Sequence, residues 1–185
     1  MDERSTLRAE RREGTPWHLG DLPDLLADRC VAVAESCTAG QVATELARVG
    51  DAASWLAGGV VAYQTSVKRS LLQVAARSVG TAEAAGEMAR GVAELLGADV
   101  AIATTGVIGT DAVDGIEPGT VFIATLVDDD LLTRERRVYG TPDERCEQAT
   151  KLACTQLVRH LDPSSDRAAT GDDRDRRRLG DEHAG

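Results

Sequence analysis

Short apolar runs separated by segments with helical spacing constrain this chain more than any other feature. Four such runs predict strands at residues 30–34, 58–64, 99–104 and 120–126. They lack the polar–apolar alternation of half-exposed strands, so each is expected to be covered on both faces. The sequence therefore predicts an α/β fold, a three-layer α/β/α single domain with helices on both faces of one sheet.

Segments with helical spacing fill the gaps between these strands. Helices are expected at residues 21–28, 39–49, 66–73, 81–96 and 142–161. Ser66 and Thr81 can cap the third and fourth of them, and Gly97 ends the fourth. A fifth strand at 131–139 would form a C-terminal β-hairpin with 120–126, so the sheet is expected to be mixed and mostly parallel. In such sheets the functional crevice lies at the carboxyl ends of the strands.

The core of this domain must be built from small aliphatic side chains. Hydrophobic residues make up 42% of the 185 residues, but aromatic residues only 3%. Ala, Val, Leu and Ile therefore have to fill the interior. A chain of this length is expected to form one domain. We place that domain at residues 20–161, between disordered polar tails at 1–19 and 162–185 that offer little to bury.

Charge and composition exclude several classes of protein. The formal net charge of -10 argues against binding of nucleic acid, which depends on a basic face. No apolar stretch approaches the ~18 residues of a membrane span, and the charged N-terminus lacks the apolar segment of a signal peptide. We therefore expect a cytoplasmic protein without a membrane partner. The four cysteines lack zinc-like spacing, so neither a metal nor a cofactor is expected.

Three segments fall where the crevice is expected, and each also has an ordinary structural interpretation. Glu35–Gly40 joins a strand to a helix through small residues, where amides and the helix dipole favour an anion; a plain turn capped by Thr38 would explain it as well. Lys68 follows Tyr63 at the next strand-to-helix junction, and is one of two lysines beside 19 arginines. It is either a functional amine or a surface lysine. Thr104–Thr110 supplies amides and hydroxyls, although a loop alone would explain its glycines.

The three histidines narrow the possible mechanisms. His18 and His183 lie in the expected tails, and His160 is expected to cap the end of the last helix. None is placed for a Ser-His-Asp or Cys-His mechanism. A nucleophile would then need lysine or tyrosine as its base. Arg69 is a cationic neighbour that could lower the pKa of Lys68.

Four motifs occur in order along residues 22–160. They are Ala34–Gly40, residues 58–74, Thr105–Gly109 and Pro118–Val121. Together they resemble the AESCTGG, GGVVxYxxxxK…LLGV, TGIAG and PVGTV motifs of the C-terminal domain of the CinA family, the competence/damage-inducible proteins. The resemblance implies a three-layer α/β/α domain that hydrolyses nicotinamide mononucleotide, a small-molecule nucleotide, to nicotinate mononucleotide and ammonia. It also implies that the enzyme needs no metal and is often a homodimer.

Carried over residue by residue, the resemblance implies a catalytic set of Ser36, Tyr63 and Lys68. Ser36 would be the nucleophile, and Lys68 and Tyr63 would form its base and proton relay. The substrate-binding residues that the resemblance implies are Glu35, Thr38, Gly40, Thr105, Gly106 and Gly109. The alternative is a catalytically inactive CinA-like domain that binds a nucleotide or a partner protein.

Three departures from the family pattern bear on the phosphate of the substrate. Ala39 replaces the first glycine of the TGG triplet, and the loop at residues 110–117 carries three acidic side chains next to a site expected to hold a phosphate monoester. The arginine expected before the last helix is absent, and Arg145, one turn later, is the substitute that the sequence offers. The separate N-terminal domain of long CinA proteins is also absent from this sequence.

Overall fold

The structure, a computed structural model, describes residues 18–162. The tails predicted at 1–19 and 162–185 therefore lie almost entirely outside the described residues. The elements run in the order η1 (Leu19–Asp21), α2 (Leu22–Leu26), β1 (Val31–Glu35), α3 (Gln41–Ala47), α4 (Ala52–Trp55), β2 (Leu56–Val61), α5 (Thr65–Leu72), α6 (Ala82–Leu96), β3 (Val100–Val107), β4 (Thr120–Val127), β5 (Asp130–Arg137) and α7 (Pro142–Leu161).

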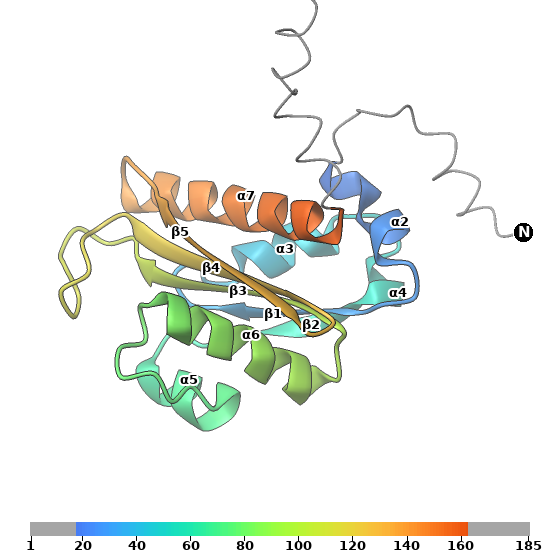
Figure 1. The fold of residues 1–185 in the computed structure, drawn as a ribbon. Helices are drawn as coiled ribbons and strands as arrows, with labels where there is room; N and C mark the ends of the chain where they lie inside the picture. The colour runs from blue at the N-terminus through green and yellow to red at the C-terminus, as the bar shows by residue number, and fades with distance from the viewer. Residues whose placement is uncertain (1–17, 163–185) are drawn as a thin grey trace, which may run out of the picture.

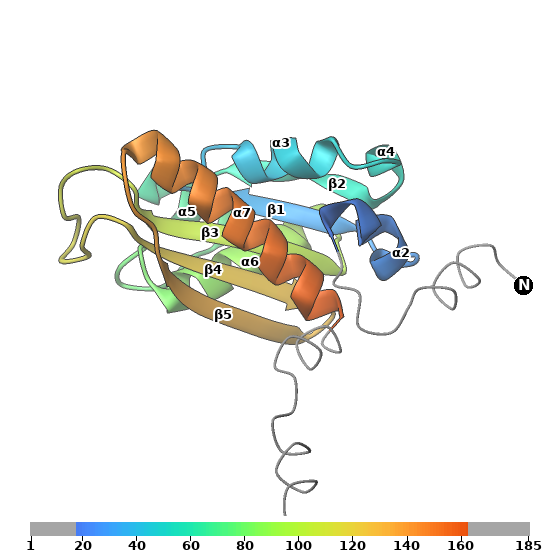
Figure 2. The same cartoon turned by 90° about the horizontal axis from the view of Figure 1, so that it is seen from above.

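The strands form one mixed sheet in the order β2-β1-β3-β4-β5 (Figure 1). β1 pairs parallel with both β2 and β3, whereas β3–β4 and β4–β5 are antiparallel. Only β4 therefore runs against the other four, which confirms the mixed sheet and the C-terminal hairpin. Helices α3 and α7 cover one face and α5 and α6 the other, and Figure 2 shows α7 lying across the sheet. The predicted three-layer α/β/α domain is confirmed.

Small aliphatic side chains fill both interfaces of the sheet, as the composition predicts. In β1, Ala32 and Ala34 pack against α6, while Val31 and Val33 face the helices of the other layer. This alternation follows from the two-residue repeat of a strand. Among aromatic residues of the described chain, Trp55 is the one buried in this core. It lies on α4, a short helix that the sequence analysis did not predict.

Several local predictions hold, but several boundaries are wrong: β2 spans Leu56–Val61 where 58–64 was expected, and α3 spans Gln41–Ala47 where 39–49 was expected. The Thr81 hydroxyl accepts from the Ala84 amide at the start of α6, and Gly97 ends that helix with a φ of 64°. The predicted cap at Ser66 is wrong, because α5 already begins at Thr65. The glycine-rich loop begins later than predicted, since β3 continues through Gly106. The strand can continue here because residue 106 is a glycine: a side chain at this position would overlap the main chain of β4.

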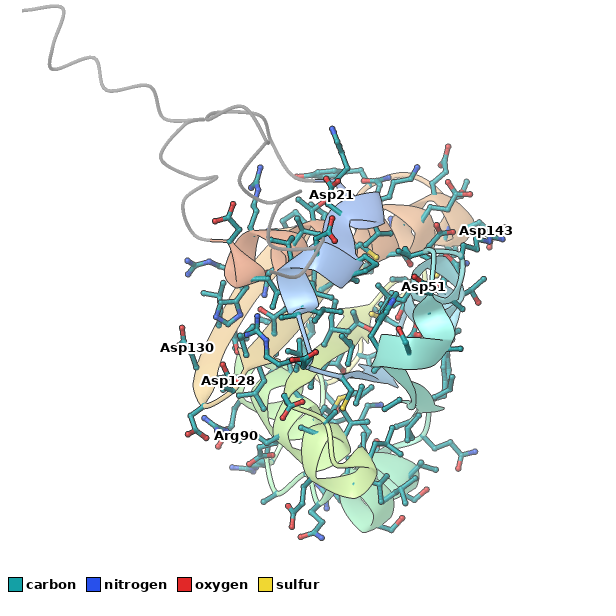
Figure 3. All side chains as sticks on the ribbon, turned by 90° about the vertical axis from the view of Figure 1, so that its right-hand side faces the viewer. Asp21, Asp51, Arg90, Asp128, Asp130 and Asp143 are labelled. Carbon is teal, nitrogen blue, oxygen red and sulfur yellow. The ribbon has the colours of Figure 1, made fainter. Side chains whose placement is uncertain are left out.

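His160 does not cap the last helix, contrary to prediction. Its Nδ1 lies 2.8 Å from Thr125 Oγ1, and its Nε2 lies 3.2 Å from a carboxylate oxygen of Asp130. Asp130 lies on the surface at the hairpin turn (Figure 3). The imidazole thus ties α7 to the β4–β5 hairpin, because the side chain turns onto the sheet instead of back along its own helix. None of the helices within residues 18–162 is long and apolar enough to cross a membrane.

Candidate active site

The carboxyl ends of β1, β2 and β3 bring the predicted site segments together. Glu35, the last residue of β1, pairs with Val61, the last of β2. Just beyond them, the Ala62 amide donates to the Glu35 main-chain oxygen (2.7 Å), and the Ser36 amide donates to the Thr104 main-chain oxygen (2.9 Å). The turn that carries Ser36 and the segment that leads to Lys68 therefore leave the sheet side by side, as expected for parallel strands.

Glu35 supplies the anion at the start of α3. Its buried carboxylate accepts hydrogen bonds from the amides of Gly40 (2.9 Å), Val42 (3.1 Å) and Ala43 (2.8 Å). Three amides and the helix dipole together compensate the burial of this charge. The structure thus places an internal carboxylate where the sequence suggested an anion site, and Glu35 and Gly40 bind each other.

In the turn after Glu35, two amides beside Ser36 donate to no other residue of the described chain. Ala39 and Gly40 both have left-handed conformations, with φ of 50° and 98°, and the Ala39 amide donates back to the Ser36 main-chain oxygen (3.2 Å). Within the described residues, the amides of Cys37 and Thr38 donate to no other residue. Amides in such a turn can stabilise a negatively charged oxygen.

The Thr38 hydroxyl is used within the protein. It lies 2.6 Å from the Thr104 hydroxyl, and the Thr38 residue is fully buried. This contact joins the turn after β1 to the end of β3. The main-chain amide of Thr38 is therefore available for the predicted substrate binding, whereas the side chain holds the turn in place.

Lys68 is a buried amine on the helix that follows β2. It lies on the second turn of α5, is only 3% exposed, and donates from Nζ to the main-chain oxygen of Tyr63 (3.0 Å). Burial lowers its pKa below the ordinary lysine value, and the nearby Cys37 thiol opposes this shift. The Tyr63 oxygen that accepts from the amine follows Ala62, whose amide bonds to Glu35, so the segments that carry Lys68 and Ser36 lie next to each other. Arg69, the expected cause of the shift, instead donates to the Arg77 main-chain oxygen (3.5 Å).

Ser36 and Tyr63 differ sharply in exposure. Ser36 is 7% exposed, within the wall of the site, whereas Tyr63 is 63% exposed. The main-chain oxygen of Tyr63, and not its phenol, is the hydrogen-bond acceptor of Lys68. The structure therefore places Ser36 and Lys68 on neighbouring segments at the carboxyl ends of β1 and β2, while the Ser-Lys pair and the relay through the phenol of Tyr63 stay predictions.

Cys37 follows Ser36 but is not activated. The residue is buried, and this burial raises the pKa of the thiol to about 12. The neighbouring Cys146 adds to the shift; its own sulfur lies 3.6 Å from the main-chain oxygens of Cys37 and Thr38. A thiol with this pKa stays protonated at neutral pH, and the thiolate is the nucleophilic form. The structure thus favours Ser36 over Cys37 as a nucleophile.

The predicted binding residues of β3 and its loop have structural roles. The buried Thr105 hydroxyl donates to the Val79 main-chain oxygen (2.7 Å). A side chain at Gly106 would overlap the main chain of Thr120 on β4. The main-chain oxygens of Ile108 and Gly109 accept hydrogen bonds from the Arg145 guanidinium. Arg145 thus holds the loop onto the first turns of α7, a role that sequence spacing alone does not reveal.

The described residues hold no candidate metal site, and their main groove lies away from the predicted site residues. Among residues 18–162, no cluster of three or more His, Cys, Asp or Glu side chains could hold a metal ion. A groove of about 890 Å³ lies between α3 and α7, with Gln41, Arg48, Thr150 and Arg159 among its lining residues. It opens on the α7 face of the sheet, and none of the predicted site residues lines it. The groove and the predicted site residues are therefore separate features of the described chain.

A buried lysine and a serine at the carboxyl edge of an α/β/α sheet define the fold and the candidate site, and comparisons with known proteins identify the family. Residues 25–161 match the family model of the CinA C-terminal domain, so this chain belongs to the CinA family, which is related to amidohydrolases in general. A CinA-like protein of Mycolicibacterium gilvum is 38% identical over 144 residues, which cover 74% of this chain and 34% of that protein. A CinA-like protein of Mycobacterium marinum has the same identity and coverage. This chain spans about a third of the length of these curated relatives.

Solved structures support the same assignment. The CinA superfamily protein from Enterobacter cloacae has a TM-score of 0.75 and 26% identity, covering 82% of this chain and 96% of that one. The CinA superfamily protein from Klebsiella pneumoniae has a TM-score of 0.71 and 30% identity, covering 78% of this chain and 98% of that one. Almost the whole of each solved chain therefore corresponds to the domain described here.

Proposed function

We propose that this chain hydrolyses the carboxamide of nicotinamide mononucleotide to nicotinate mononucleotide and ammonia, as an amidohydrolase of pyridine nucleotide recycling. The observation that carries the proposal is Lys68, a buried amine whose lowered pKa follows from desolvation and whose segment leaves the sheet beside the one that carries Ser36. A lysine of this kind has a larger neutral fraction near physiological pH and can accept a proton from a hydroxyl. Arginine stays charged and could not do so.

The proposed reaction has two steps. Ser36 Oγ attacks the carboxamide carbon while Lys68 Nζ takes the hydroxyl proton; this proton then passes to the departing nitrogen, which leaves as ammonia. Water next attacks the resulting ester, again losing a proton to Lys68, and Ser36 Oγ recovers that proton as nicotinate mononucleotide is released. One amide bond and one water are consumed, and no oxidant, reductant or metal takes part.

The amides of Cys37 and Thr38 suit the negative charge that develops on the carbonyl oxygen. They lie on the same turn as Ser36 and donate to no other residue within the described chain. Main-chain donors held in a turn need no reorganisation when charge appears, which is the basis of an oxyanion hole. The Glu35 carboxylate supports the role indirectly, because its three hydrogen bonds hold the start of α3 and hence the turn.

A second candidate function is nucleotide or partner binding without turnover. The observation that favours it is the loop at 110–117, where Asp111, Asp114 and Glu117 lie on the surface. These carboxylates would repel a phosphate monoester. Arg145 supplies a positive charge at the base of this loop through its contact with the Ile108 and Gly109 oxygens, and it offsets part of the repulsion.

An assay of the full chain with nicotinamide mononucleotide distinguishes the two functions. We expect equal amounts of ammonia and nicotinate mononucleotide, measured by an enzyme-coupled ammonia assay and by chromatography, and no product with Ser36→Ala. Saturable binding of the nucleotide by calorimetry without any product from the wild-type chain would instead support the second candidate. Neither binding nor turnover would contradict both.

A further inference from the structure

The helix that carries Lys68 is short and depends on α6 for its place. α5 spans only eight residues, Thr65–Leu72. It packs mainly against α6, which itself packs against the sheet (Figure 1). An isolated helix of this length is not stable in water. Contacts made by α6 therefore fix where α5 lies and how deeply the Lys68 amine is buried.

The end of α5 is closed on Lys68 itself. The main-chain oxygen of Lys68 accepts hydrogen bonds from the amide of Gln73 and from the amide of Val74 (3.1 Å). Gln73 has a left-handed conformation, with φ of 54°, which ends the helix. Val74 is buried in the same core cluster as Leu72. The main chain at residues 73 and 74 therefore holds the backbone of Lys68.

One side chain of α6 holds the segment that follows. The Glu87 carboxylate accepts hydrogen bonds from the amides of Ala75 and Ala76, each 2.9 Å from the same carboxylate oxygen. Hydrogen bonds to an ionised group are stronger than those between neutral groups. Glu87 is thereby joined to the end of α5 through residues 74–76, and it lies outside the four sequence motifs.

A second contact brings α6 close to the same end of α5. A side chain at Gly91 would overlap the main chain of Leu72, the last residue of α5. Helix residues four apart lie on one face, so Glu87 and Gly91 contact successive parts of one segment. The close approach at Gly91 and the carboxylate of Glu87 thus hold the end of α5 at two points.

We propose that Glu87 is a positioning residue for Lys68: its carboxylate holds residues 75 and 76 on α6 and so keeps the Lys68 amine buried at the carboxyl end of β2. This inference rests on the proposed function, because it assigns Glu87 a part in the use of Lys68 as a base. Without the carboxylate, α5 would move and water would reach the amine. Its pKa would then rise toward the ordinary lysine value, since burial is the main cause of the lowered pKa.

A direct effect of the Glu87 charge on the amine would have the opposite sign. Removal of a nearby negative charge lowers the pKa of an amine, whereas hydration of a buried amine raises it. Burial and, in the opposite sense, the Cys37 thiol shift the pKa of Lys68. Glu87→Ala removes both the charge and the acceptor, while Glu87→Gln keeps an oxygen that can accept from both amides. The two variants together separate charge from position.

The first measurement is the titration of the Lys68 amine, which requires no turnover. The chain has two lysines, Lys68 and Lys151, so labelling with carbon-13 lysine gives two side-chain NMR signals, which Lys151→Arg assigns. In the wild-type chain Lys68 should titrate below the exposed Lys151. In Glu87→Ala its pKa should rise by about one pH unit or more, and in Glu87→Gln it should stay close to wild type.

The second measurement is turnover of nicotinamide mononucleotide. Glu87→Ala should lower kcat about 10- to 100-fold and leave KM within about threefold of wild type, because Glu87 acts through the main chain. Glu87→Gln should recover most of the rate. Glu94→Ala removes an exposed carboxylate from the same helix and is the matched control, in which titration and rate should not change.

Thermal melts followed by circular dichroism check that each variant is folded. If Glu87→Ala is not folded, Glu87→Asp replaces it, because aspartate keeps the charge but is one methylene too short to hold both amides. The pKa of Lys68 should rise in this variant as well.

Three results would overturn the proposal. The first is a wild-type Lys68 that titrates together with Lys151. The second is a folded Glu87→Ala chain in which either the Lys68 pKa or kcat stays at its wild-type value, which would leave Glu87 a purely structural residue. The third is a Lys68 pKa that falls in Glu87→Ala, as a direct charge effect requires. A Lys68 pKa that rises as expected in a chain whose wild type releases no ammonia would support the positioning and contradict the proposed function.

Discussion

Each end of the sheet carries a hydroxyl and a nitrogen base. At the carboxyl ends of β1 and β2, Ser36 follows β1, and the Lys68 amine donates to the main-chain oxygen of Tyr63 just after β2. At the opposite end, near the end of the antiparallel β4, Thr125 shares a hydrogen bond with His160, which also contacts Asp130. The second group has the residue types of a hydroxyl–imidazole–carboxylate triad, yet Thr125 is completely buried between sheet and helix.

The difference shows that residue types alone do not make a reactive site. Thr125 also lies 3.4 Å from the side-chain nitrogen of Gln156, a second buried side chain of α7. Its hydroxyl holds α7 on the sheet and cannot meet a substrate. Ser36 instead lies where parallel strands end and helices begin, the usual position of binding sites in such sheets. Each prediction below tests one side of this contrast.

Ser36→Ala should have the largest effect. Loss of the nucleophile is expected to lower amide hydrolysis by about 1,000-fold or more, measured as ammonia release from nicotinamide mononucleotide. Thr125→Val is the matched control, because it removes the other hydroxyl; its rate should stay within about twofold of wild type. A folded Ser36→Ala chain with wild-type turnover would remove Ser36 from the mechanism.

Lys68→Arg should be nearly as damaging as Lys68→Ala. General-base catalysis contributes about 100-fold or more, and arginine keeps the charge but cannot release its proton. The rate of the wild-type chain should rise with pH through an ionisation below the ordinary lysine pKa, and both variants should lack this ionisation. Lys151→Arg, the same change at an exposed lysine of α7, is the control. More than a tenth of the wild-type rate in Lys68→Arg would contradict a Ser-Lys mechanism.

Lys68→Met should stabilise the fold at neutral pH. Burial lowers the pKa of Lys68 in the folded chain, so the unfolded chain binds more protons between this pKa and the ordinary value of about 10.4. The stability of the wild-type chain therefore rises with pH in that window, and the advantage of the variant should shrink there. Denaturant melts from pH 7 to 10.5 measure this gap. A gap that widens with pH would show that the amine is not desolvated.

His160→Ala should lower stability and leave turnover unchanged. The variant loses the contacts to Thr125 and Asp130, worth about 1 kcal/mol or somewhat more, which corresponds to a fall in Tm of about 2–4 °C. Ammonia release should stay within about twofold of wild type. A loss of activity in the folded variant would mean that the second group takes part in chemistry after all.

Cys37→Ser should have the smallest effect on the rate. The thiol is buried, with a pKa of about 12, so iodoacetamide at pH 8 should modify the partly exposed Cys30 first. Peptide mass spectrometry gives the two rates of modification. Rapid inactivation of the wild-type chain that Cys37→Ser prevents would instead place a reactive thiolate at the site.

Local sequence patterns alone determined much of this protein. Several features all follow from residues within a few positions of one another: the apolar runs of β1, β3 and β4, the hairpin, the cap at Thr81 and the end of α6 at Gly97. The motifs around Ser36 and Lys68 likewise placed both residues at strand-to-helix junctions. Such features depend on backbone propensity and hydrophobic period, which a short stretch of sequence carries in full.

Tertiary structure alone decided how the polar residues are used. The Glu35 carboxylate accepts hydrogen bonds from amides five to eight residues later in the chain. This spacing differs from the three-residue spacing of a capping box. Burial, and not Arg69, lowers the pKa of Lys68, and His160 bonds residues 35 and 30 positions away instead of its own helix. Desolvation and long-range hydrogen bonds depend on which segments pack together, and neither periodicity nor motif spacing specifies that packing.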